Sequence, residues 1–160
     1  MKVALIVSLL VMSLALNAET LQGRVVRVAD GDTITILDAT NTQNKVRLNK
    51  IDAPEKSQAF GEVSRKHLAS MVASKNVQVE WTKKDKYGRI LGDISIGTTN
   101  VNLRMVQDGL AWHYKRFDNT PAYAQAENEA RAKKVGLWRD TNPIPPWEFR
   151  KAKKEKGDSQ

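Results

Sequence analysis

The chain has 160 residues, with 26 Lys and Arg against 18 Asp and Glu, which gives a formal net charge of +8 at pH 7. This length suits one domain with its own hydrophobic core. The absence of cysteine from the sequence excludes disulfides, thiolate metal sites and thiol nucleophiles. The basic excess favours a polyanionic partner, namely nucleic acid, anionic lipid or acidic glycan, without choosing among them.

The first eighteen residues have the layout of a secretory signal peptide. Lys2 precedes an apolar stretch of fourteen residues, 3–16, which is short for a helix that spans a bilayer. Small residues follow, and Ala18 stands just before Glu19, as at a cleavage site. An uncleaved anchor is the alternative, because the residue at position −3 is Leu rather than Ala. We expect residues 1–18 to be removed, and the mature protein to be secreted or periplasmic without stable membrane insertion.

The mature chain begins with a pattern that predicts three strands. Residues 21–29 are rich in β-branched residues, an Asp-Gly-Asp turn follows, and 33–37 returns as a second strand. A polar turn over 39–44 leads into a third strand at 45–51. The N-terminal part is therefore expected to be β-structure.

Helices and two further strands are predicted in the rest of the domain. Apolar residues at helical spacing predict a helix over 59–74, and alternating patterns predict strands at 76–82 and 89–96. The segments 101–109 and 122–136 are typical of helices that end at glycine. Five strands with a helix after the third indicate an α+β protein, and closure into an OB-type barrel would remove the edges of the sheet.

The C-terminal segment differs from the rest in composition. Three prolines follow Asn142, and five basic residues crowd into 150–156. Charge runs of this kind are usually solvated, although non-specific tethering of nucleic acid is a second interpretation. We expect one domain over 19–140 and a flexible basic tail over 141–160.

Acidic and arginine side chains gather near the ends of the predicted strands. Charge that develops on a phosphodiester during hydrolysis is best neutralised by guanidinium groups, which bind two oxygens in one plane. Carboxylates can hold a hard cation that polarises the phosphate, and another carboxylate can activate water. Asp32 and Asp52 are candidates for the metal, Glu55 for the base, and Arg47 with Arg89 for the phosphate.

Each of these features also has a structural interpretation. Asp-Gly is the usual signal of a hairpin turn, and the Asp-Ala-Pro-Glu segment that begins at Asp52 equally suits the start of a helix. Arg47 alone is more often a solvated strand residue than a phosphate ligand, and 85–89 can be a charged hairpin loop. Residue types and spacing alone therefore leave a metal-assisted hydrolase as one alternative among several.

Several motifs taken together resemble the staphylococcal nuclease family. VADGDT, VRLNKIDAPE and KDKYGR occur in this order, and VNLRMVQDGLAWHY and AENEARAKKVGLW follow them. The resemblance extends from about Gly23 to Trp138, which is most of the mature chain. It implies an α+β fold, a five-stranded OB-fold β-barrel with three α-helices, and calcium-dependent cleavage of DNA and RNA that leaves 3′-phosphates.

The resemblance also assigns roles to individual residues. It implies Ca²⁺ as the cofactor, bound by three residues: Asp32, Asp52 and the backbone carbonyl of Ala53. It implies that Arg47 and Arg89 bind the phosphate and that Glu55 is the general base. Two tyrosines, Tyr87 and Tyr114, correspond to residues beside the bound nucleotide. DNA and RNA would be the substrates, and we expect a monomer.

Two other classes of function remain open from the sequence. OB barrels also bind single-stranded nucleic acid without cutting it, although such a module has no need of a base or of a metal pair. A basic exported protein that acts on envelope polyanions is the third alternative, and its binding would survive chelation of metals.

Overall fold

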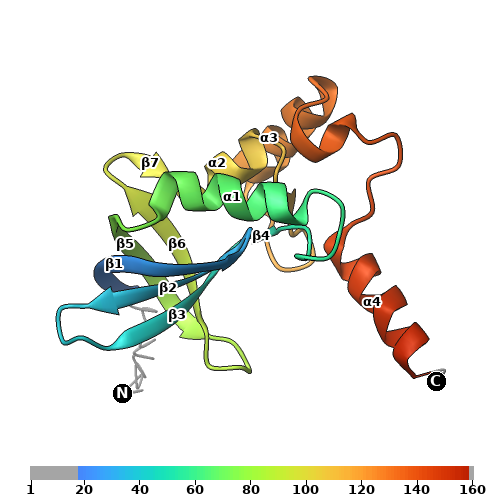
Figure 1. Cartoon of the computed structure of the whole chain (residues 1–160). Coiled ribbons are helices and arrows are strands. Elements are labelled where there is room, and N and C mark those ends of the chain that lie inside the picture. The colour runs from blue at the N-terminus through green and yellow to red at the C-terminus, as the bar shows by residue number, and fades with distance from the viewer. Residues whose placement is uncertain (1–17, 159–160) are drawn as a thin grey trace, which may run out of the picture.

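A closed β-barrel forms the centre of the molecule, as the computed structural model shows for residues 18–158 (Figure 1). β1 pairs antiparallel with β2 and β5, and β2–β3 and β5–β6 are antiparallel as well. Parallel pairing of β3 with β6 closes the barrel. The barrel strands are β1 (Glu19–Asp30), β2 (Thr33–Asp38), β3 (Gln43–Leu48), β5 (Asn76–Lys84) and β6 (Ile90–Ile96). The predicted five-stranded OB-type barrel is confirmed.

Alternating side chains fill the barrel. On β2, Ile34 and Ile36 are completely buried, and Val46 and Leu48 point into the same core from β3. Because successive strand residues point to opposite faces, this register turns Arg47 away from the core. Burial of each such aliphatic side chain contributes about 1.5–3 kcal/mol. The hydrophobic pattern therefore fixes on which face the arginine lies.

Helices cover one end of the barrel (Figure 1). α1 (Gly61–Val72) crosses the barrel strands and buries Leu68 and Val72 in the core. α2 (Val101–Gln107) and α3 (Pro121–Ala132) pack together behind α1, and a 3₁₀ turn, η1 (Gly136–Arg139), follows. Within residues 18–158, none of the helices is long and apolar enough to cross a membrane.

Residues 18–158 contain four α-helices, one more than the predicted three. α4 (Pro146–Gly157) lies in the segment predicted to be a flexible tail, and in Figure 1 it extends away from the barrel. Proline at the first helical position, Glu148 in the first turn and lysines in the last turn are all favourable for a helix. The charge run that suggested disorder is therefore part of a helix. Most of the predicted signal peptide, residues 1–17, lies outside the described residues.

The predicted third strand ends earlier than the sequence indicated. β3 stops at Leu48, and Lys50 adopts a left-handed conformation with φ of 67°. The chain turns there and forms the short strand β4 (Ile51–Asp52), which pairs with β8 (Trp112–His113). β7 (Thr99–Asn100) extends the main sheet beside β6. The turn at Lys50 directs Asp52 back toward Arg47.

Asn102 joins α2 to the barrel through buried hydrogen bonds, and its loss should be costly. Its side-chain amide donates to the carbonyls of Asn49 and Gly92 at 3.1 and 2.9 Å, and its Oδ1 atom accepts from the Ile94 N–H at 3.0 Å. Asn102→Ala removes these three hydrogen bonds from a buried place, and should lower the free energy of unfolding by about 2–4 kcal/mol in urea denaturation.

Asn142→Ala is the matched control, because Asn142 is exposed. It should change the free energy of unfolding by less than about 0.5 kcal/mol. An equal, small effect of both substitutions would contradict this account of the junction between α2 and the barrel.

Candidate active site

Arg47 connects three segments of the chain through its guanidinium group. Its Nη2 atom lies 3.1 Å from Asp32 Oδ2 and 2.9 Å from Asp52 Oδ1. Its Nη1 atom donates to the carbonyls of Leu48 and Ile51 at 2.7 and 3.0 Å. The Arg47 side chain is only 12% exposed, so these contacts lie in a largely desolvated place. The arginine thus ties the β1–β2 turn to the turn that follows β3.

Asp32 is held by backbone as well as by charge. Its Oδ2 atom accepts a hydrogen bond of 2.7 Å from the Ala53 N–H, and its Oδ1 atom accepts one of 3.1 Å from the Thr33 hydroxyl. The Leu48 N–H donates to the Asp32 carbonyl at 2.8 Å. These contacts fix the aspartate in the hairpin turn that the sequence predicted. The Asp-Gly-Asp segment is therefore both a turn and part of a charged cluster.

Glu55 follows the same turn and lies at the entrance to α1. Its backbone N–H donates to Gln58 Oε1 at 3.1 Å. Gly61 packs so closely on this loop that an added Cβ would overlap the carbonyl oxygen of Glu55. The close approach requires glycine and keeps the loop short. The Glu55 side chain remains 37% exposed, within reach of solvent.

A residue from α4, Arg150, also reaches the cluster. Its Nη1 and Nη2 atoms lie 3.1 and 2.8 Å from the two carboxylate oxygens of Asp52, and Nη1 lies 2.7 Å from Glu55 Oε1. These charge-assisted contacts raise the pKa of Arg150 above its usual range. Sequence reasoning missed Arg150, because it placed the basic run in a solvated tail. The spacing of Trp147 and Arg150 by one helical turn was the available signal.

Burial raises the pKa values of two acidic residues at the site, Asp30 and Asp52. It raises the pKa of Asp52 above its ordinary value, although hydrogen bonding to Arg150 and the charge of Arg47 oppose the shift. Burial, with repulsion from Asp32, raises the pKa of Asp30 to about 7. Asp30 also accepts a hydrogen bond of 3.1 Å from the Asp32 N–H. The sequence placed Asp30 in the turn but did not single it out, because its burial depends on the closed barrel.

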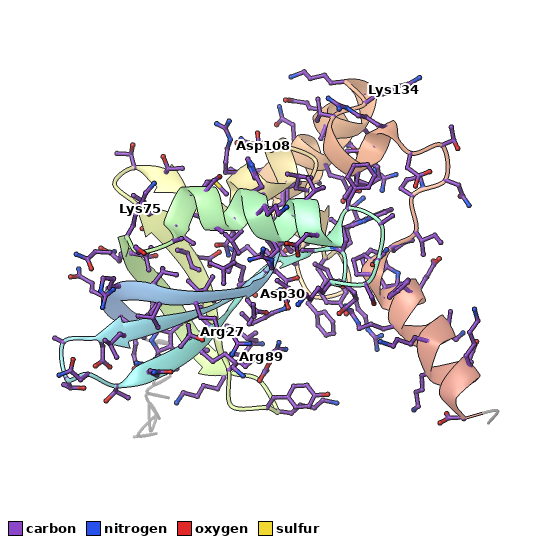
Figure 2. All side chains as sticks on the ribbon, viewed as in Figure 1. Arg27, Asp30, Lys75, Arg89, Asp108 and Lys134 are labelled. Carbon is purple, nitrogen blue, oxygen red and sulfur yellow. The ribbon has the colours of Figure 1, made fainter. Side chains whose placement is uncertain are left out.

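Arg89 lies near this cluster but makes different contacts. It directly precedes β6, two residues before Leu91, the register partner of Arg47. Within the described part of the chain its guanidinium is hydrogen-bonded only through Nε, to Asp85 at 2.7 Å. Figure 2 shows Asp30 where the strands converge beneath α1, and Arg89 at the loop between β5 and β6. Tyr87, in the same loop, is 72% exposed and lies beneath the Arg89 guanidinium, 5.6 Å from it.

Tyr114 is covered by other aromatic rings. Trp147 stacks on it with a centroid distance of 5.5 Å and an interplanar angle of 7°. Phe117 contacts the tyrosine edge-on at 4.7 Å. Trp147 also packs against Trp112, at 5.5 Å. The structure therefore separates Tyr114 from Tyr87: one is stacked beneath the first turn of α4 and the other is exposed on a loop.

The predicted residues fall into two groups in space. Arg47 joins Asp32 and Asp52 directly, Ala53 contacts Asp32, and Glu55 is linked to Asp52 through Arg150. Arg89, Tyr87 and Tyr114 lie outside these contacts. The fold and the cluster define a class of protein: an OB-type barrel that carries paired guanidinium and carboxylate groups beside its helical end, an arrangement suited to phosphate chemistry.

Comparisons with known proteins agree with this class. Residues 45–140 match the family described as staphylococcal nuclease homologues, so the chain belongs to the staphylococcal nuclease family. An uncharacterized endonuclease of Haemophilus influenzae is 49% identical over 131 residues, covering 82% of this chain and 74% of the relative. A micrococcal nuclease of Shigella flexneri is 44% identical over 146 residues, covering 83% and 82%. The predicted family is confirmed, and membership supports a nuclease function.

The geometry predicts unequal structural roles for the two arginines. Arg47→Ala removes the charged partner of Asp32 and the donor to two carbonyls, and leaves Asp52 with Arg150 as its only guanidinium partner within residues 18–158. We expect a loss of about 3 kcal/mol in the free energy of unfolding, measured with urea in the absence of divalent metals. Arg89→Ala breaks a partly exposed pair and should cost less than about 1 kcal/mol. Equal losses would show that Arg47 does not join the segments as described.

Proposed function

We propose that this protein is an exported, calcium-dependent nuclease that cleaves DNA and RNA and leaves 3′-phosphate products. The contacts of Arg47 with Asp32 and Asp52 carry the proposal, because they place a guanidinium and two acidic oxygen donors in one small volume. Family membership supports the coarser conclusion of a nuclease. The roles of individual residues and the dependence on calcium are part of what we propose.

The donor chemistry of the cluster fits a hard divalent cation. Asp32 and Asp52 present carboxylate oxygens, which calcium prefers, and the backbone carbonyl of Ala53 is the third proposed donor. Within residues 18–158, no three His, Cys, Asp or Glu side chains are grouped as a ligand set. Binding through two aspartates, a carbonyl and water should therefore be weak, on the order of 10⁻⁴–10⁻³ M, as in extracellular modules. Such a site suits a secreted or periplasmic protein.

Each residue of the chain has a distinct proposed task. Bound calcium would supply Lewis-acid stabilisation of the phosphoryl oxygens. Arg89, whose terminal nitrogens are not hydrogen-bonded within residues 18–158, would bind a phosphate oxygen, and Arg47 would neutralise charge from the other side. Glu55 would take the proton of the attacking water. The water oxygen would bond to phosphorus as the bond to the 5′-oxygen breaks, the 5′-oxygen would take a proton from solvent, and the phosphate would stay on the 3′ side.

Aromatic residues provide the proposed contacts with the nucleotide. The Tyr87 ring is exposed beside Arg89, so a base or sugar next to the bound phosphate can pack against it. Tyr114 would provide a second contact once its stacked face is accessible. Stacking on a tyrosine ring tolerates any base, which agrees with cleavage without sequence preference.

The role of Glu55 can be tested with one isosteric change. Glu55→Gln removes the base but keeps the shape of the side chain, so cleavage of single-stranded DNA and RNA should fall about 10²- to 10⁴-fold in millimolar calcium. Chelation should abolish cleavage by the unmodified chain. Product ends are identified by their response to a 3′-phosphatase, and oligonucleotide binding is followed by fluorescence anisotropy.

Glu62→Gln is the matched control, because Glu62 also pairs with an arginine, Arg65, but on the surface of α1. It should keep full activity. Tight binding of oligonucleotides without products under any divalent metal would favour the non-catalytic binding module. Binding of envelope polyanions that survives chelation, without nuclease products, would favour the third class.

Export predicts a defined mature N-terminus. Expression of the full chain in a bacterial host should yield a protein that begins at Glu19, because Ala18 ends the predicted signal segment. Intact mass spectrometry of the periplasmic fraction and the medium checks this expectation. An unprocessed chain that remains in the membrane fraction would instead indicate an anchor.

A further inference from the structure

The first turn of α4 covers two places that the proposed function needs. At one, Arg150 holds both oxygens of Asp52 and one oxygen of Glu55. At the other, Trp147 stacks on Tyr114 with nearly parallel rings. Arg150 follows Trp147 by three residues, so both side chains leave the same side of the helix. One short segment thus contacts a proposed metal ligand, the proposed base and a proposed nucleotide contact.

Each contact resembles a contact that a substrate complex would contain. A guanidinium between two carboxylates takes the position of a cation, and a flat indole on tyrosine takes the position of a base. We propose that α4 is an internal competitor of the site, and that calcium and nucleic acid bind fully only after its first turn has left. This inference rests on the proposed calcium site, and it adds a closed and an open state to it.

The docked contact opposes the reaction rather than assisting it. Asp52 already accepts from Arg47, and Arg150 occupies both of its oxygens, so few lone pairs remain for a cation. One carboxylate oxygen of Glu55 is taken up by the Arg150 guanidinium at 2.7 Å, so less of the carboxylate is available to accept a proton from water. If Arg150 only positioned Glu55, it would have no reason to occupy both oxygens of the proposed metal ligand Asp52 as well.

The buried and half-buried residues of α4 lie at its N-terminal end. Pro146 is buried, and Trp147 and Phe149 are half-buried. Every residue from Arg150 to Asp158 is exposed. In the chain before the helix, Gln58 donates to the Ile144 carbonyl at 2.6 Å. Docking therefore rests on the N-terminal residues of α4, and release breaks the ion pairs of Arg150 and the ring contacts of Trp147.

The charges of α4 explain how nucleic acid would favour the open state. A cleft of about 330 Å³ lies beside Glu55, lined by Glu55, Ser57, Phe149, Arg150, Lys153 and Lys154. Its basic side chains come from the same helix that blocks Asp52. A phosphate chain that enters the cleft can pair with these cations and draw Arg150 away from the carboxylates. The segment that closes the site in the absence of substrate can thus bind the substrate's backbone when open.

Calcium binding measured directly tests the inference. In isothermal titration of the chain from Glu19 to Gln160, Arg150→Ala should bind calcium about tenfold more tightly than the unmodified chain, because no competing cation has to leave. Lys151→Ala, on the same helix, removes the same charge from a 78% exposed side chain that pairs only loosely with Glu155, at 4.0 Å. It should leave the calcium affinity within twofold.

Tryptophan fluorescence adds a readout of the helix itself. In the Glu55→Gln chain, which should not cleave the oligonucleotide, calcium together with single-stranded DNA should change the emission, and adding Trp147→Phe should remove most of that change. Thermal melting checks that each variant is folded. Arg150→Lys should lie between the unmodified chain and Arg150→Ala in calcium affinity, because a point charge cannot hold both carboxylates as a fork does.

The outcomes separate this inference from the proposed function. If Arg150→Ala binds calcium with unchanged or lower affinity, α4 does not compete with calcium, and Arg150 supports the site instead. The calcium site itself then stands. If neither the unmodified chain nor Arg150→Ala binds calcium, the proposed calcium site is wrong. The proposed competition for that site is then wrong as well. Tighter calcium binding in Arg150→Ala but not in Lys151→Ala is the result that we expect.

Discussion

The site depends on one buried guanidinium. Arg47 lies between Asp32 and Asp52 and also holds the carbonyls of Leu48 and Ile51. Without it, acidic groups from two turns would face each other in a place of low polarity, where like charges repel strongly. The same contacts fold the chain back after β3. Local architecture and the chemistry of the site therefore rest on the same group, and neither can change alone.

The barrel and its charged end could be predicted because local signals and global packing agree. Alternation in β2 and β3 determines that Val46 points inward and Arg47 outward, and Asp-Gly marks the turn that presents Asp32. The family motifs added the roles of these residues. The bend at Lys50 was not predictable, because a left-handed lysine leaves no mark in composition. Tertiary contacts around Arg47, rather than local preference, select that conformation.

The C-terminal helix shows a different limit of sequence reasoning. Five basic residues within 150–156 indicate a solvated segment, and all five are exposed. The contacts of the segment with the barrel are made by its N-terminal residues, where Trp147 stacks on Tyr114 and Arg150 donates to Asp52. These partners are distant in sequence, so no local sequence pattern predicts the contacts. The composition of the segment therefore did not indicate that Trp147 and Arg150 contact the barrel domain.

Pro143 and Pro145 lie in the segment that connects the domain to α4, and Pro146 is the first residue of the helix. Proline restricts the backbone, so the link is a semi-rigid spacer and a detached first turn stays near the place it left. A tethered group of this kind meets its target at an effective concentration on the order of millimolar. Return of the helix is intramolecular, so dilution of the protein does not alter the fraction of molecules with the helix in place. If the protein is exported as proposed, it would keep the same balance between the proposed docked and released states of α4 in a large volume outside the cell.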